Sequence, residues 1–159
     1  MSNLDLPQQA ASSSAAEEHV AETLVTRVAE YFAAARPAGV SSAYVFGSRA
    51  RGTAHRESDV DVAVLLSHAA VRERAARSLV AMGLGSALIA ATHCNNVDVV
   101  VLNDAPPELA AAVIGHGRRV YCADEAADHA FVRTALLRRA DLRPFLERTR
   151  RVKLRALAS

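Results

Sequence analysis

The sequence predicts an α+β fold in which helices cover a small mixed β-sheet, and three observations support this class. Four short segments, at 40–46, 59–66, 97–102 and 118–122, are mostly Val and other apolar residues, as strands of a covered sheet are. Segments with helical apolar spacing lie between them. A last helical stretch follows the fourth strand and forms a C-terminal extension from about residue 124.

Length and composition fit one globular domain. The chain has 159 residues, of which 51% are hydrophobic and 23% charged, so a single core is expected. A net charge of +2 points to no particular class of partner. No apolar run approaches 18 residues and the N-terminus lacks a signal-peptide pattern, so we expect no membrane span and a cytoplasmic location. Cys94 and Cys122 are isolated and have no zinc-site spacing.

The predicted domain begins after an N-terminal segment. Residues 1–15 are rich in Ser, Gln and Ala without periodicity, so we expect them to be disordered and the folded domain to occupy 16–159. From residue 17 apolar residues recur at helical spacing, and Pro37 with Gly39 ends that helix. The recurring residues are Val20, Leu24, Val28 and Phe32.

The second helical region is predicted as two pieces. A helix over 69–82 would carry an apolar stripe that includes Leu79 and Met82, and Gly83 and Gly85 would separate it from a short apolar helix over 86–92. The polar surface around 84–91 is small, which leaves open whether this pair packs in the core or forms part of an interface with another protein.

The C-terminal third is predicted to be helical. Pro106 and Pro107 begin a helix that ends near Gly117. A long helix over 123–141 would be broken at Pro144 and followed by a second piece. The sequence after Phe131 contains nine basic residues and only two acidic ones. This charge pattern is typical of a solvated helix face, a binding surface for an acidic partner or an RNA contact. Aromatic residues are not interleaved with them, so direct nucleic-acid binding is not expected.

The candidate site begins where the first strand ends. Gly47-Ser48, a ten-residue spacer and then Asp59-Val60-Asp61 precede the second apolar run. Residues i and i+2 of a strand project to the same side, so Asp59 and Asp61 would lie about 6.5 Å apart at Cα. Carboxylates this close repel one another unless a cation lies between them, and Mg²⁺ suits such ligands. Gly47 and Ser48 could hold phosphate oxygens, and Arg51 could offset their charge.

Asp98 is the third candidate acid. It is the only charged residue in the β-branched run over 97–102. A carboxylate in such a run needs an explanation, because burying it is costly. Either Asp98 lies at a frayed strand end in water or it joins the other two acids at a metal site.

These motifs resemble the nucleotidyltransferase superfamily typified by DNA polymerase β, with its Gly-Ser, ten-residue, Asp-x-Asp signature and later carboxylate. More narrowly, Gly47 to Gly52 followed by Ser58 to Asp61 resembles the minimal nucleotidyltransferases, the MntA-type antitoxins of HEPN/MNT toxin–antitoxin systems. The resemblance covers the chain from about residue 17 and implies the DNA polymerase β-like fold.

The resemblance also implies a site and a reaction. Asp59, Asp61 and Asp98 would hold two Mg²⁺ ions, with Asp98 as general base or metal ligand, and Gly47, Ser48 and Arg51 would bind ATP. The protein would then be a protein adenylyltransferase that transfers AMP to a tyrosine of a cognate HEPN ribonuclease toxin and so neutralises it. A hetero-oligomer with that toxin would follow.

Two other functions remain open at this point. The chain could neutralise a toxin by stoichiometric binding, which would need no ATP and leave the toxin mass unchanged. It could also transfer a nucleotide to a small antibiotic, although it has no room for a separate acceptor-binding domain.

Overall fold

A four-stranded mixed sheet forms the centre of the protein. The computed structural model describes residues 6–50 and 59–157. The strands are β1 (Val40–Phe46), β2 (Val60–Leu66), β3 (Val97–Val101) and β4 (Arg118–Cys122), in the order β3-β2-β1-β4. β1 pairs antiparallel with β2 and β4, whereas β2 and β3 are parallel. The strand positions and the α+β class agree with the sequence prediction.

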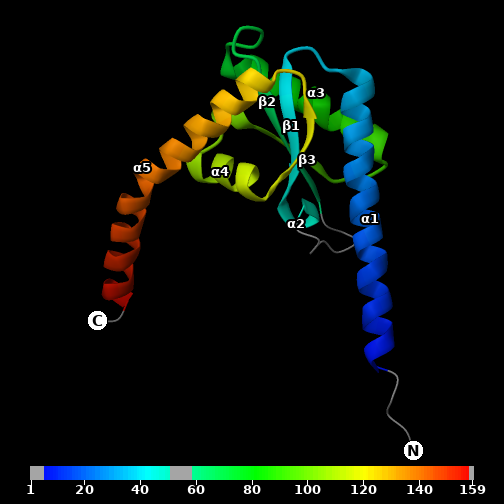
Figure 1. Ribbon diagram of the computed structural model, residues 1–159, viewed down its shortest axis with the longest axis horizontal. Helices are drawn as coiled ribbons and strands as arrows, with labels where there is room; N and C mark the ends of the chain where they lie inside the picture. Colours follow the sequence, from blue (N-terminus) through cyan, green and yellow to red (C-terminus); the bar gives the residue numbers. More distant parts are fainter. Residues whose placement is uncertain (1–5, 51–58, 158–159) are drawn as a thin grey trace, which may run out of the picture.

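Helices cover both faces of this sheet (Figure 1). On one face, side chains of β2 that include Val62 and Val64 pack with Phe32 of α1 (Leu6–Ala35) and Leu88 of α3 (Arg74–Thr92). On the other face, a smaller cluster that includes Leu65 packs against α4 (Pro107–His116) and α5 (Glu125–Leu157). Because side chains alternate along a strand, each helix pair receives every second residue of β2.

The connections bring the end of β1 and the starts of β2 and β3 to one edge of the sheet. The short helix α2 (Gly47–Ala50) follows β1 directly. Helix α3 makes the crossover that two parallel neighbours require, and the 3₁₀ helix η1 (Leu102–Asp104) follows β3. The end of β1 therefore lies beside the starts of β2 and β3.

Helix α3 differs from the prediction of two pieces. It continues through Gly83 and Gly85, because the burial of Leu84 and Leu88 outweighs a helix-propensity cost of about 1 kcal/mol for each glycine. Leu79 and Met82 of the predicted stripe are 69% and 70% exposed, so these two residues do not pack in the core and the alternative of an interface stays a prediction.

Helix α3 is also the one helix, among the residues described, with the length and apolar composition of a membrane span. The sequence prediction of no such segment therefore needs this qualification. The finding is weak evidence for a membrane, because core helices of soluble proteins pass the same test.

The two terminal helices are longer than predicted. Helix α1 begins at Leu6, so much of the segment expected to be disordered is helical here, in keeping with the helix propensity of its Ala and Gln residues. Helix α5 is continuous from Glu125 to Leu157 with Pro144 inside it, and it changes direction along its length (Figure 1). Proline removes one intrahelical hydrogen bond and commonly bends a helix without ending it, and Pro144 lies inside α5 in this way.

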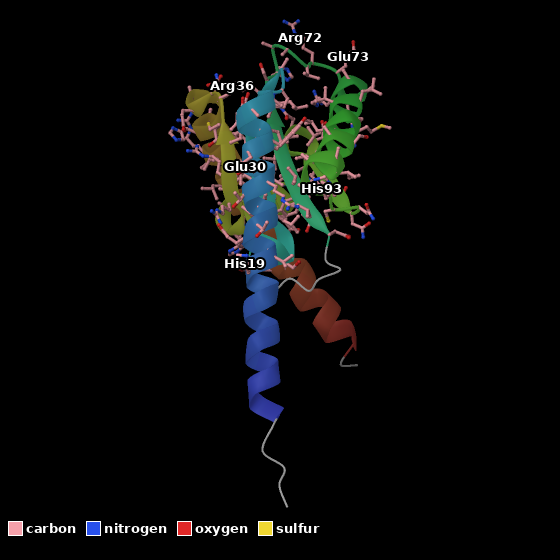
Figure 2. The ribbon with its side chains drawn as sticks, turned by 90° about the vertical axis from the view of Figure 1, so that its right-hand side faces the viewer. His19, Glu30, Arg36, Arg72, Glu73 and His93 are labelled. Carbon is pink, nitrogen blue, oxygen red and sulfur yellow. The ribbon has the colours of Figure 1, made fainter. Side chains whose placement is uncertain are left out.

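Both terminal helices extend beyond the sheet on the side where α2 lies (Figure 1). Figure 2 views the molecule along the face covered by α1 and shows the part of the helix before His19 projecting past the strands.

A buried acid attaches α5 to the sheet. Asp128 is 1% exposed and accepts hydrogen bonds from Ser42 Oγ at 2.6 Å, Tyr44 Oη at 2.7 Å and Arg119 Nη1 at 2.8 Å. Burial alone would raise the pKa of Asp128, but these three hydrogen bonds outweigh it and hold that pKa below its usual range. Burial and the bond to Asp128 raise the pKa of Tyr44 well above its usual range.

Candidate active site

The three predicted acids come together at the starts of two neighbouring strands. Asp61 of β2 pairs in register with Asp98 of the parallel strand β3. Partners in register on adjacent strands point to the same face and lie about 4.8 Å apart. Asp59 precedes Asp61 by two residues and is exposed, as is Asp98. The geometry therefore brings together acids separated by more than thirty positions in the chain.

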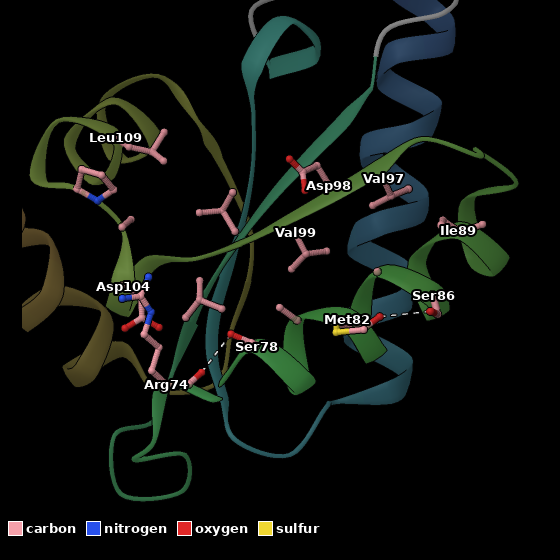
Figure 3. Close-up of a pocket in the computed structure, with 16 residues that line it drawn as sticks. Arg74, Ser78, Met82, Ser86, Ile89, Val97, Asp98, Val99, Asp104 and Leu109 are labelled. Atoms are coloured by element: carbon pink, nitrogen blue, oxygen red, sulfur yellow. Dashed lines mark hydrogen bonds between the residues drawn. The ribbon is translucent and has the colours of Figure 1, made fainter. Parts of the chain in front are cut away.

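These acids lie on the face of the sheet that α4 and α5 cover. On β2, Asp61 shares its side with Ala63 and Leu65, which pack in the smaller core cluster. That cluster does not extend over the start of the strand, since Asp61 is only partly buried. The carboxylates consequently stand at an open rim beside an apolar core, and Figure 3 shows Asp98 at this rim.

Strand β1 brings Gly47 against the acids. Phe46 pairs with Asp61 across the antiparallel ladder, so Gly47 follows directly beside it. Gly47 has φ +77°, in the left-handed region that glycine adopts without strain. A Cβ added at Gly47 would overlap Asp61 Oδ2. Only glycine therefore allows the backbone of this turn to approach the carboxylate.

The remaining predicted nucleotide-binding residues follow in the chain. Ser48 is partly buried in α2, next to Gly47. Arg51 lies outside the described residues, so its predicted contact with phosphate stays a prediction.

The donor set fits Mg²⁺. Asp59 and Asp98 line a hollow of about 430 Å³ together with Asn95, Asn96 and Val97. Carboxylate and amide oxygens are hard ligands of the kind Mg²⁺ prefers, and an open rim leaves positions for water and phosphate. Asn95 and Asn96 were not among the predicted site residues. Two amides directly before a strand that carries a candidate acid were the signal for their place in this rim.

A second acidic group has the spacing of a metal site but another explanation. Ligand atoms of Cys122, Glu125 and Asp128 lie within 4.8 Å of one another. The guanidinium of Arg119 donates to Glu125 at 2.9 Å and to Asp128 at 2.8 Å, and it approaches Cys122 Sγ at 3.8 Å. The guanidinium of Arg119 already balances the charge of these acids. The group therefore serves as a contact between β4, which carries Arg119, and α5, which carries the acids. Burial and the nearby Glu125 raise the pKa of the Cys122 thiol.

Comparison with protein families finds a matching family model for the chain. The family model described as Polymerase beta, Nucleotidyltransferase matches residues 28–126, a range that contains every predicted site residue.

A curated relative and two solved structures are similar to the chain. Protein adenylyltransferase MntA from Shewanella oneidensis is 37% identical over 78 residues, which are 49% of this chain and 51% of the relative. The chain thus matches about half the length of that relative. A crystal structure of a toxin–antitoxin with AMP-PNP superposes with a TM-score of 0.56 at 26% identity, over 85% of this chain and 98% of that one. The toxin–antitoxin MntA-HepT gives 0.51 at 22% identity, over 87% and 99%, and that likeness concerns the fold.

Proposed function

Because the chain belongs to the polymerase beta nucleotidyltransferase family, we propose that it is a Mg²⁺-dependent protein adenylyltransferase that acts as an antitoxin. It transfers AMP from ATP to a tyrosine of a partner HEPN ribonuclease toxin, in the cytoplasm, and this modification neutralises the toxin. The observation that carries the proposal is the pairing of Asp61 with Asp98, together with the hollow that Asp98 and Asp59 line.

Asp59, Asp61 and Asp98 are the residues that would hold two Mg²⁺ ions in this proposal. When bound, the ions supply stabilisation of charge on the triphosphate and a lowered pKa for the acceptor hydroxyl. Like-charged carboxylates on adjacent strands repel one another, and this repulsion favours a cation between them. The rim is open to solvent, which suits a substrate that brings its own phosphate ligands.

The other residues position the nucleotide and move a proton. Gly47 lets the turn lie close to the phosphates, Ser48 donates its hydroxyl to them and Arg51 offsets their charge. The tyrosine oxygen forms a bond to the α-phosphorus, and the bond from that phosphorus to the oxygen leading to the β-phosphorus breaks. Pyrophosphate leaves with the electron pair of that bond. The carboxylate of Asp98 accepts the tyrosine proton and passes it to water.

The relatives support adenylyl transfer over other nucleotidyl transfers. The curated relative is named a protein adenylyltransferase, and the structure with AMP-PNP holds an analogue of ATP in a toxin–antitoxin. Both properties belong to those proteins and come to this chain as part of the proposal.

Intact-mass spectrometry of the HEPN protein encoded beside this chain tests the proposal. After incubation with the chain, ATP and Mg²⁺, the partner should gain mass in steps of one AMP unit. Asp59→Ala should abolish the gain, while its thermal stability in EDTA stays the same or rises because a repulsive charge is gone. Peptide mapping should place the added AMP on tyrosine.

Other results would replace the proposal. An active Asp59→Ala protein would refute the assignment of the site. Unchanged toxin mass, with toxin inhibited at a one-to-one ratio without ATP, would indicate an antitoxin that acts by binding. Transfer of AMP to an aminoglycoside by the isolated chain would indicate an enzyme of antibiotic modification.

A further inference from the structure

Strand β3 has one open edge. It is the terminal strand in the order β3-β2-β1-β4 and pairs only with β2 among the described strands. Exposed edges are commonly blunted by Lys, Pro or a bulge. The segment from Val97 to Val101 is Val-Asp-Val-Val-Val, and its pairing with β2 is continuous. Such a strand is suited to pair with another extended segment.

The hydrogen-bonding direction of β3 shows which groups face the open edge. The N–H of Val60 donates to the carbonyl of Asn96 at 2.9 Å, so the backbone groups of Asn96 point toward β2. Successive residues of a strand direct their amides to alternate sides, and Val97, Val99 and Val101 therefore direct theirs away from β2. Within the described chain, no turn or loop bond is found for the backbone groups of Val97 or Val99. Val97 and Val99 therefore offer both their N–H and their C=O groups at this edge. Val101 offers its N–H, because its carbonyl begins η1 as the N-cap residue.

A groove of about 660 Å³ runs along this edge. Its walls are one side of α3 and the start of α4, represented in Figure 3 by Met82 and Ile89 on one side and Leu109 on the other. The hydroxyls of Ser78 and Ser86 donate back to carbonyls of their own helix, at 3.1 and 3.2 Å, so the α3 wall stays largely apolar. A strand with apolar side chains would bury both its backbone and its side chains here.

The two ends of the groove carry opposite charge. At one end lies Asp98, which also belongs to the carboxylate rim (Figure 3). At the other end Arg74 lies beside Asp104, which Arg77 already holds through two bonds of 2.6 and 2.8 Å. Two guanidinium groups against one carboxylate leave this end positive, and it suits an acidic side chain.

We propose that this groove binds the acceptor: an extended segment of the partner protein pairs with the edge of β3 and carries its tyrosine hydroxyl to Asp98. This inference rests on the proposed function and deepens it. An acidic residue of the segment lies toward Arg74. With a rise of about 3.3 Å per residue, Val101 is about 10 Å from Asp98, which puts this acid about three or more positions from the tyrosine.

Continuity with the site favours an acceptor as the occupant. Asp98 belongs to the carboxylate rim by its register with Asp61 and to the groove by its position on β3. A segment seated on β3 therefore passes within reach of the acids, and backbone pairing fixes the position of each side chain along it. Binding of this kind would let the sheet domain itself select one tyrosine of the partner.

Two glycines of α3 provide a matched test. A Cβ at Gly85 would lie 3.7 Å from Val99 Cγ2, in the groove, whereas a Cβ at Gly83 would have no atom within 4 Å. Either substitution replaces a helical glycine and raises helix propensity, so both variants are expected to fold. Gly85→Gln should lower kcat/KM for the partner protein at least about tenfold, mainly through KM, and Gly83→Gln should change it less than about twofold.

Charge reversal provides a second pair. Arg74→Glu should weaken transfer to the partner about fivefold or more, because the positive end of the groove is lost. Arg72→Glu makes the same change in net charge at an exposed position outside the groove lining and should have little effect. Titration of AMP-PNP and Mg²⁺ into each variant reports whether the nucleotide site is intact.

The outcomes separate the two proposals. If the unmodified chain does not transfer AMP, the proposed function fails. If it transfers AMP and Gly85→Gln performs like Gly83→Gln, the groove proposal is overturned while the function stands. A dimer of the unmodified chain that Gly85→Gln converts to monomers, with transfer unchanged, would assign the groove to a second copy and would also overturn the proposal.

Discussion

Two acidic clusters lie on the same face of one sheet, and they differ in what surrounds them. Asp128 is buried and accepts hydrogen bonds from three donors. Asp59 and Asp98 are exposed at the open rim where β2 and β3 begin. The buried acid is balanced within the fold, whereas the acids at the rim are arranged beside a hollow that a metal and phosphates can enter. Solvent access, rather than acidity, distinguishes the cluster that stabilises from the one proposed to act.

The largest expected effect tests the rim cluster. Asp61→Asn keeps the shape of the side chain and removes its charge, so transfer of AMP should fall on the order of 10³-fold. Urea unfolding should show a free energy of unfolding close to that of the unmodified protein. Substantial transfer by Asp61→Asn would remove the distinction between the two clusters.

The buried cluster should show the opposite result. Asp128→Ala leaves Arg119, Tyr44 and Ser42 without their acceptor and should lower the free energy of unfolding by about 3 kcal/mol. Transfer of AMP, measured at a temperature where the variant is folded, should remain within several-fold of normal. Loss of transfer with unchanged stability would mean that Asp128 takes part in the chemistry.

The pH dependence of stability sharpens the comparison. Tyr44 has a raised pKa in the folded protein, so its contribution is present below about pH 10, where unfolded tyrosine titrates, and is lost as the pH rises above that value. Urea unfolding between pH 8 and about pH 11 should therefore show a decline. Tyr44→Phe should be less stable at neutral pH, because a hydrogen bond to Asp128 is gone, and should decline less steeply at alkaline pH.

Acid pH weakens the same hydrogen-bond network by protonating Asp128. The pKa of Asp128 is lowered, so its contribution is present above about pH 4 and is lost as the pH falls through the folded value. In Asp128→Asn this part of the acid decline should disappear.

The smallest effect is expected at an exposed ion pair. Arg118 and Glu22 approach to 2.7 Å, but their side chains are 55% and 58% exposed. Arg118→Ala should lower the free energy of unfolding by less than about 1 kcal/mol and leave transfer unchanged. A cost similar to that of Asp128→Ala would show that donor geometry matters more than burial in this protein.

Much of the site could be predicted because its signal is local. Gly47, Asp59 and Asp61 lie within fifteen positions of one another. A strand periodicity of two predicts that the side chains of Asp59 and Asp61 project to one side. Asp98 could be predicted because an acid is conspicuous in a run of Val. The partnership of Asp128 with Ser42 and Tyr44 was missed, since it joins residues more than eighty positions apart. Polar residues on alternate positions of β1 were the available signal.

The errors in the helices have one physical cause. Gly83 and Pro144 weaken a helix locally, and the sequence was interpreted as though local propensity decides where a helix ends. Burial of residues such as Leu88 contributes more than that propensity costs, so α3 continues. The sequence left open whether Leu79 and Met82 are buried, because an apolar stripe does not reveal which face of a helix the fold covers.

The open edge of β3 also bears on the fate of the protein in a cell. An uncovered strand of β-branched residues invites association with any other extended chain, including a copy of itself. The concentration of protein that stays unaggregated therefore depends on the fraction of molecules whose β3 edge is covered by a binding partner. Production in excess of whatever covers β3 should favour aggregates or proteolytic removal, and this would tie the abundance of the chain to that of its binding partner.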